Sequence, residues 1–224
     1  MALIEIKNIS KTYIETAEIT TPALKGITLN IEKGDFAAVA GPSGSGKTTL
    51  LNIIGALDKP TSGQIYYDGE DMTAIPLNRL ADFRLHQIGF VFQSYNLINT
   101  LTAFENVEYI MLLQGRPTGE RARMAKDLLG RVGLSAFMRR RPAQMSGGQQ
   151  QRVAVARAIA AQPKVVLADE PTANLDSKTA GELLDLMKEL NKEKGVTFLF
   201  STHDKMVMDK ADKLFRMKDG SIIN

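Results

Sequence analysis

The segment GPSGSGKT, residues 41–48, combines the residue types that bind a phosphate chain. Its glycines let backbone N–H groups turn inward, Lys47 supplies a point charge for the outer phosphates, and the Thr48 hydroxyl can bind magnesium. The segment matches the phosphate-loop pattern in full and stands between an expected strand and an expected helix. The sequence therefore predicts a nucleotide-phosphate site made of Gly41, Pro42, Ser43, Gly44, Ser45, Gly46, Lys47, Thr48 and Thr49.

Two carboxylates end a second apolar run, VVLADE, at residues 165–170. Asp169 falls at the carboxyl end of the expected strand, where we expect it to hold magnesium through water. Glu170 is expected to project toward the last phosphate and to polarise an attacking water. The run therefore predicts the metal-binding and general-base half of a hydrolytic site.

Two further apolar runs end in polar side chains. FLFSTHD delivers His203, which can donate a hydrogen bond to a γ-phosphate oxygen. GFVFQS ends near Gln93, whose amide oxygen can bind magnesium and which stands where the core gives way to helical segments. His86, in RLHQIG, has no comparable setting, so we expect an ordinary surface or helix-end residue.

A second candidate anion site lies in MSGGQ, residues 145–149. Ser146 supplies a hydroxyl, Gly147 and Gly148 leave backbone N–H groups bare, and the helix that follows directs its positive end outward. The same residues are also typical of a serine-capped helix start. Taken alone, this segment leaves both interpretations open.

The elements that must position these residues follow a strand and helix rhythm. Alternating and buried-type runs predict strands at residues 3–9, 27–31 and 35–40, and helical spacing follows at 47–56. Helical patterns dominate from about 101 to 161, after which strands and helices alternate again. We expect an α/β core of residues 1–94 and 161–224, with a mixed N-terminal sheet, a parallel core sheet and an inserted helical subdomain at 95–160.

Composition limits the class of protein. The 224 residues contain no cysteine, which excludes disulfides, thiolate metal sites and cysteine nucleophiles. Glu5 and Lys7 interrupt the first apolar stretch, so we expect no signal peptide. No apolar run approaches the roughly 20 residues that cross a bilayer, so any membrane role is expected to come through a partner. The formal net charge of +3 suits phosphate ligands or an anionic membrane surface and does not decide between them.

Together, and in this order, the motifs resemble the ATP-binding-cassette (ABC) ATPases. The phosphate loop is the family's Walker A motif, Asp169 and Glu170 end its Walker B motif, and the resemblance covers essentially the whole chain. It implies that ATP and Mg²⁺ are bound, with Thr48, Gln93 and Asp169 as magnesium ligands and with Glu170, His203 and Lys47 as catalytic residues. It also implies that Tyr13 stacks on adenine and that two copies assemble head to tail. Each site would then pair one phosphate loop with Ser146, Gly147, Gly148 and Gln149 of the other copy.

Longer segments, such as GPSGSGKTTLLNIIGALDKPTSGQI and ADEPTANLDS, resemble the subgroup that contains LolD, MacB and FtsE. This resemblance implies an integral membrane permease as partner, a periplasmic adaptor reached through that permease, and a place on the cytoplasmic face of the inner membrane. Met145 departs from the leucine that is usual there and keeps an unbranched apolar contact. Because the chain stops at Asn224, soon after its last expected strand, we expect no C-terminal regulatory domain.

Three alternatives stay open at this level. An FtsE-like ATPase would transmit force without transport. A soluble protein acting on nucleic acid or ribosomes would usually carry long coiled coils or two cassettes, neither of which is evident, so we expect no direct nucleic-acid partner. The third alternative is a phosphate-loop GTPase or small-molecule kinase; a GTPase needs Asn-Lys-x-Asp to read guanine, and NKEK at residues 191–194 lacks the acid.

Overall fold

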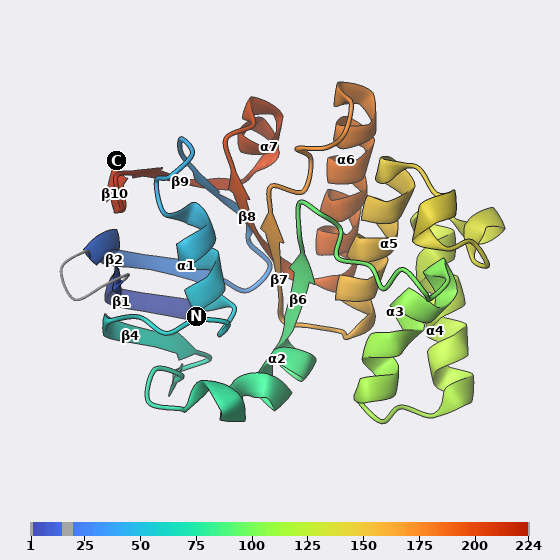
Figure 1. The fold of residues 1–224 in the computed structure, drawn as a ribbon, viewed down its shortest axis with the longest axis horizontal. Coiled ribbons are helices and arrows are strands. Elements are labelled where there is room, and N and C mark those ends of the chain that lie inside the picture. The colour runs from blue at the N-terminus through green and yellow to red at the C-terminus, as the bar shows by residue number, and fades with distance from the viewer. Residues whose placement is uncertain (1, 15–19, 224) are drawn as a thin grey trace. The chain divides into compact units, whose positions relative to one another are not determined.

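The computed structural model describes residues 2–14 and 20–223 (Figure 1). The chain forms two compact units. The first unit contains the residues up to 84 and those from 197 onward, and the second unit contains residues 85–196. The subdivision expected from the sequence, with a helical subdomain at 95–160, stays a prediction.

The first unit contains an antiparallel sheet built on the N-terminal strand. β1 (Ala2–Ile14) pairs with β2 (Thr20–Glu32) on one side and with β4 (Ser62–Tyr67) on the other, and β4 pairs with β5 (Glu70–Asp71). The apolar side chains of β1 recur at alternate positions, so Ile4 and Ile6 face the core and are fully buried. Ile6 lies opposite Leu29 of β2 and Ile65 of β4, which are also buried.

The first unit also contains parallel strands that carry the phosphate loop. β3 (Phe36–Ala40) pairs in parallel with β8 (Thr197–Thr202) and β9 (Lys213–Lys218), and β10 (Ser221–Ile223) pairs antiparallel with β9. All five residues of β3 are buried, as expected for a strand covered on both faces. The rings of Phe36 and Phe200 pack with centroids 4.7 Å apart. Helices α1 (Lys47–Ile54) and α7 (Lys205–Lys210) and the 3₁₀ turn η1 (Leu77–Leu80) complete this unit.

The second unit is mainly helical. α2 (Ala81–Gln87), whose last three residues belong to this unit, leads into β6 (Ile88–Val91), which pairs in parallel with β7 (Val165–Asp169). The helices are α3 (Ala103–Leu113), α4 (Thr118–Arg131), α5 (Gly147–Ala160) and α6 (Ser177–Lys194), with 3₁₀ turns at η2 (Ser135–Phe137) and η3 (Pro142–Gln144). α5 contacts α3, α4, α6 and β6, and its small side chains allow this close packing.

The fold class expected from the sequence is confirmed. Antiparallel and parallel sheets occur together with helices, and a run of three helices, α3 to α5, stands between strands β6 and β7 in the chain. The N-terminal sheet, which the sequence led us to expect as mixed, is antiparallel in every pair among its described strands.

Candidate nucleotide-binding and catalytic site

The phosphate loop joins β3 to α1. Gly41 N donates to Thr202 O at 3.2 Å, which ties the loop's first residue to the end of β8. Lys47 is buried, and its Nζ donates to Gly41 O at 2.9 Å and to Pro42 O at 3.0 Å. The loop carbonyls therefore surround the lysine ammonium at the start of the helix.

Gly46 makes this turn possible. Its φ is 99°, a backbone conformation that side chains with a Cβ rarely adopt, and a Cβ there would lie 2.5 Å from Ala23 O. Gly46 is also the N-cap residue of α1, and no side chain caps this helix start.

The loop has the donor groups that a triphosphate needs. Ser45 is 2% exposed, and its Oγ is a buried polar atom without a hydrogen-bond partner in the structure. None of residues 47–50 is acidic, so the first turn of α1 itself carries no negative charge that would repel an anion. An unpaired buried hydroxyl, an uncapped helix start and a buried lysine together fit phosphate oxygens.

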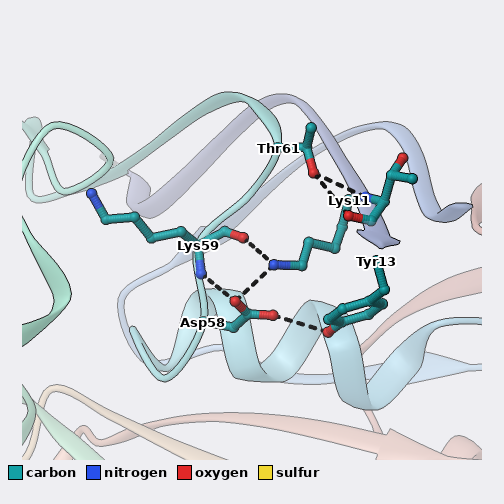
Figure 2. Close-up of polar contacts among 6 residues, drawn as sticks. Lys11, Tyr13, Asp58, Lys59 and Thr61 are labelled. Carbon is teal, nitrogen blue, oxygen red and sulfur yellow. Dashed lines mark hydrogen bonds and ion pairs between the residues drawn. The ribbon is translucent and has the colours of Figure 1, made fainter. Parts of the chain in front are cut away.

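Tyr13 lies near the end of β1 and is 38% exposed. Its hydroxyl donates to Asp58 Oδ2 at 2.9 Å, and Lys11 Nζ lies 4.8 Å from the centre of its ring (Figure 2). The aromatic residue expected to contact adenine is therefore present in the same unit as the phosphate loop.

His203 directly follows β8 and is exposed. Asp204 N donates to Thr202 Oγ1 at 2.9 Å, and the Asp204 carboxylate accepts from Met206 N at 2.8 Å, which caps α7. These hydrogen bonds fix the backbone on both sides of His203. Because Gly41 N is bonded to Thr202 O, the residue before His203 adjoins the start of the phosphate loop.

The two carboxylates end β7 in the second unit. Residues 165–168 are buried, whereas Asp169 and Glu170 are half-buried. Glu170 has a φ of 45°, and its carbonyl accepts from Ala173 N at 3.2 Å in the turn that follows. A non-glycine residue in this left-handed conformation stores strain, which is typical of functional sites.

The backbone around Gln93 is held by side chains from elsewhere in the second unit. Asn174 Nδ2 donates to Gln93 O at 3.0 Å, and Gln151 Nε2 donates to Phe92 O at 3.4 Å and to Pro171 O at 2.8 Å. Arg157 donates to Tyr95 O at 3.0 Å and to the carbonyl of Asn96 at 2.6 Å. The Gln93 side chain is exposed while its backbone is fixed.

Ser146 is the N-cap residue of α5. Its Oγ accepts from Gln149 N at 3.3 Å, and Gln149 Oε1 accepts from Ser146 N at 3.0 Å, so the two form a capping box. A Cβ at Gly147 would lie 2.6 Å from the Tyr95 hydroxyl oxygen. The serine-capped helix start is therefore present, and Ser146 is exposed on it.

The predicted magnesium ligands offer hard oxygen atoms: a hydroxyl on Thr48, an amide on Gln93 and a carboxylate on Asp169. Within residues 2–14 and 20–223, no group of three or more His, Asp or Glu side chains could hold a metal ion. Oxygen ligands are the kind that Mg²⁺ prefers, together with water and substrate phosphates. His86 is exposed at the end of α2.

These features define a phosphate-loop nucleotide-binding protein of α/β fold. Residues 24–173 match the family model described as ABC transporter. The chain is 48% identical to the lipoprotein-releasing system ATP-binding protein LolD 1 of Rhodopseudomonas palustris, over 98% of each chain. It is 46% identical to the macrolide export ATP-binding/permease protein MacB of Syntrophobacter fumaroxidans, over 99% of this chain and 31% of that protein.

A solved structure is similar over nearly its whole length. The dimeric post-hydrolysis cassette MJ0796 of Methanocaldococcus jannaschii, bound to ADP and Pi, has a TM-score of 0.91 at 44% identity, over 99% of this chain and 97% of that chain.

The chain belongs to the ABC transporter family. It is an ATP-hydrolysing, nucleotide-binding subunit of the LolD and MacB type, and it uses ATP with Mg²⁺. The comparisons do not favour the alternatives of force transmission without transport or of a nucleic-acid protein.

Proposed function

We propose that two copies of this chain bind two ATP molecules head to tail and drive a separate permease of the lipoprotein-release or macrolide-export class. Three findings support this. LolD is named as the ATP-binding protein of a lipoprotein-releasing system, MacB carries an ATP-binding part and a permease in one protein, and the MJ0796 cassette is dimeric with ADP and Pi. Among the described helices none is long and apolar enough to cross a membrane.

The phosphate loop carries this proposal. Lys47 would contact the outer phosphates, and the Ser45 hydroxyl and the first N–H groups of α1 would bind phosphate oxygens. On binding, the ammonium exchanges its two carbonyl partners for charged phosphate oxygens, which are stronger acceptors. Tyr13 would stack on the adenine.

The residues that carry the chemistry have distinct roles in the proposal. The Glu170 carboxylate orients and polarises a water molecule, which attacks the γ-phosphorus as the bond to the ADP oxygen breaks. His203 donates a hydrogen bond to a γ-phosphate oxygen, where negative charge is concentrated. Thr48, Gln93 and Asp169 would hold Mg²⁺, which supplies positive charge that neutralises phosphate charge when it is bound.

Ser146, Gly147, Gly148 and Gln149 are proposed to meet the ATP held by the phosphate loop of the partner copy. Ser146 is exposed, as this role requires, although its hydroxyl also accepts the capping hydrogen bond. The γ-phosphate would close the dimer by adding contacts across it, and its loss would open the dimer again.

The location follows from the partner. We propose that the chain lies on the cytoplasmic face of the inner membrane, held there by the permease, and that any periplasmic adaptor is reached through the permease. Nucleic acid is not among the proposed partners. Purification with the permease from the native host, and identification of that permease, tests this part.

The test of the site is Glu170→Gln, measured beside the exposed control Glu189→Gln on α6. The Glu170 variant should bind ATP normally, lose at least about 100-fold in turnover and elute as a dimer only when ATP is present. The control should behave as wild type. Wild-type turnover by Glu170→Gln would refute the role assigned to Glu170. A wild-type chain that stays monomeric in the presence of ATP and still hydrolyses it at the full rate would refute the proposed dimer.

A further inference from the structure

Tyr13 is held at both its hydroxyl and its ring. Its hydroxyl donates to Asp58 Oδ2 at 2.9 Å, and Lys11 Nζ donates to Asp58 Oδ1 at 2.7 Å (Figure 2). Lys11 and Tyr13 are two residues apart on β1 and therefore point to the same side of the sheet. The ammonium lies 4.8 Å from the ring centre, so it covers one face of the ring.

Asp58 is itself fixed by backbone groups. Its own N–H donates to Asn52 O at 3.2 Å, which attaches it to the last turns of α1, and its Oδ1 accepts from Lys59 N at 2.7 Å. Lys11 Nζ also donates to Lys59 O at 2.7 Å. The carboxylate is thus tied to the helix that begins with Lys47, the lysine of the phosphate loop.

A second pair of contacts joins the same two segments. Thr12 N donates to Thr61 Oγ1 at 3.0 Å, and the Thr61 hydroxyl lies 3.4 Å from Thr12 O. The backbone next to Tyr13 is therefore fixed to the loop that carries Asp58. With its backbone held on one side and its hydroxyl on the other, the ring cannot swing without breaking a hydrogen bond.

The cluster is charged at neutral pH. Burial alone would raise the pKa of Asp58, but the hydrogen bonds from Lys11, Tyr13 and the Lys59 N–H outweigh it and lower the pKa. The ionised carboxylate accepts strong hydrogen bonds and balances the Lys11 ammonium. Tyr13 nevertheless remains 38% exposed, so the ring keeps open surface while its orientation is fixed.

We propose that Asp58 is a positioning residue for the nucleotide base: with Lys11 it holds the Tyr13 ring so that the uncovered face receives adenine. This inference rests on the proposed stacking role of Tyr13. A ring that is ordered before binding loses less side-chain entropy when the base arrives. Because Asp58 is tied to α1, one helix sets both the phosphate contacts and the base contact.

The experiment uses the full chain and compares Asp58→Ala, Asp58→Asn, Tyr13→Phe and the double variant Tyr13→Phe/Asp58→Ala. The matched control is Asp71→Asn, which removes a carboxylate that accepts from Thr73 N and Gln64 Nε2 in the same unit, on β5. Calorimetry in EDTA gives the ATP dissociation constant without turnover, and steady-state assays give KM and kcat. Inorganic tripolyphosphate serves as a ligand without a base.

Asp58→Ala should weaken ATP binding by about three- to tenfold, as the loss of charge-assisted hydrogen bonds implies. The loss should fall on KM rather than on kcat, and Asp58→Asn, which keeps one acceptor, should recover part of it. In the Tyr13→Phe background the same Asp58 substitution should have a smaller effect, since phenylalanine makes no hydrogen bond to it. Tripolyphosphate binding and the Asp71 control should be unchanged.

Two results would overturn the inference: equal weakening of ATP and tripolyphosphate by Asp58→Ala, or an undiminished effect in the Tyr13→Phe background. Tyr13→Ala separates the inference from the proposed role on which it rests. If Tyr13→Ala leaves ATP affinity unchanged, the stacking role itself fails and the inference with it. If Tyr13→Ala weakens ATP while both Asp58 variants bind like wild type, only the positioning inference fails.

Discussion

Arg157 offers a direct test of how the backbone just after Gln93 is held. Its guanidinium bonds to Tyr95 O and Asn96 O, and these two residues have φ values of 61° and 48°. Arg157→Met keeps an unbranched stem of similar shape and removes both hydrogen bonds. Each hydrogen bond from a charged donor contributes about 1.5–3 kcal/mol. Burial lowers the pKa of Arg157, which means that desolvation of the charged form offsets part of this gain.

The net local cost of Arg157→Met should therefore be about 2 kcal/mol. The effect should be confined to this loop. Tyr95 and Asn96 are non-glycine residues in the left-handed region, and they can adopt less strained backbone conformations once the arginine is gone. A local cost of about 2 kcal/mol corresponds to roughly 30-fold faster opening. Hydrogen exchange at the Tyr95 and Asn96 amides, which bond to Phe92 O and Ser94 O, measures it directly.

Arg152→Met is the matched control, because Arg152 lies on the same helix and bonds instead to Val132 O and Glu182. It should leave exchange at Tyr95 and Asn96 unchanged. Wild-type exchange rates at these two amides in Arg157→Met would refute the reasoning. So would faster exchange that was equal throughout α4, since that would report general unfolding.

Three further outcomes are expected. Gly46→Ala should lose about 2–3 kcal/mol of stability and most ATP affinity, because φ is 99° and Ala23 O stands 2.5 Å from the new Cβ; urea unfolding and calorimetry check this. Tyr67→Phe should lower the free energy of unfolding by about 1 kcal/mol, since the buried Tyr67 hydroxyl donates to Ile54 O; an unchanged urea midpoint would contradict it. The Thr102 N–H and hydroxyl, which bond to Glu105, lower the pKa of Glu105. A carboxyl whose folded-state pKa is lowered stabilises the protein above its ordinary pKa and loses that effect as pH falls through the lowered value. Any stability advantage of wild type over Glu105→Gln should thus begin to fall near the ordinary glutamate pKa of about 4.3 and disappear as pH drops below the lowered value.

The sequence predicts the elements whose patterns are local. The expected helix at residues 47–56 is α1 (Lys47–Ile54), and the apolar strands KVVLA (164–168) and VTFLFS (196–201) lie within one residue of β7 and β8 at each end. β2 was missed in its first half, because Pro22 and the polar residues beside it carry no alternating pattern. Those residues are a strand only because β1 pairs with them, as Thr12 does with Pro22. β10 was missed for the same reason, because its three residues form a strand only through pairing with β9.

The candidate site divides in the same way. Residues that follow buried strands, such as Asp169 and His203, could be found because a strand's end is visible in the apolar pattern. Asp58 and Arg157 were not found, since each acts on a residue 45 to 62 positions away. A long-range hydrogen bond leaves no local periodicity. For Asp58 the only available signal was an acidic residue directly before Lys59 and Pro60, which indicates a turn and no partner.

The phosphate loop shows why a binding site can be stable before its ligand arrives. A buried ammonium without partners would be costly, and the Gly41 and Pro42 carbonyls satisfy Lys47 within its own loop. The Ser45 hydroxyl, by contrast, is left buried and unpaired, so the loop retains a cost that phosphate can relieve. Two changes therefore favour triphosphate binding. The Lys47 ammonium exchanges neutral acceptors for charged ones, and the Ser45 hydroxyl acquires a hydrogen-bond partner. Loss of the Ser45 hydroxyl alone, in Ser45→Ala, removes only the second gain, so it should weaken ATP less than Lys47→Ala in the same calorimetric titration.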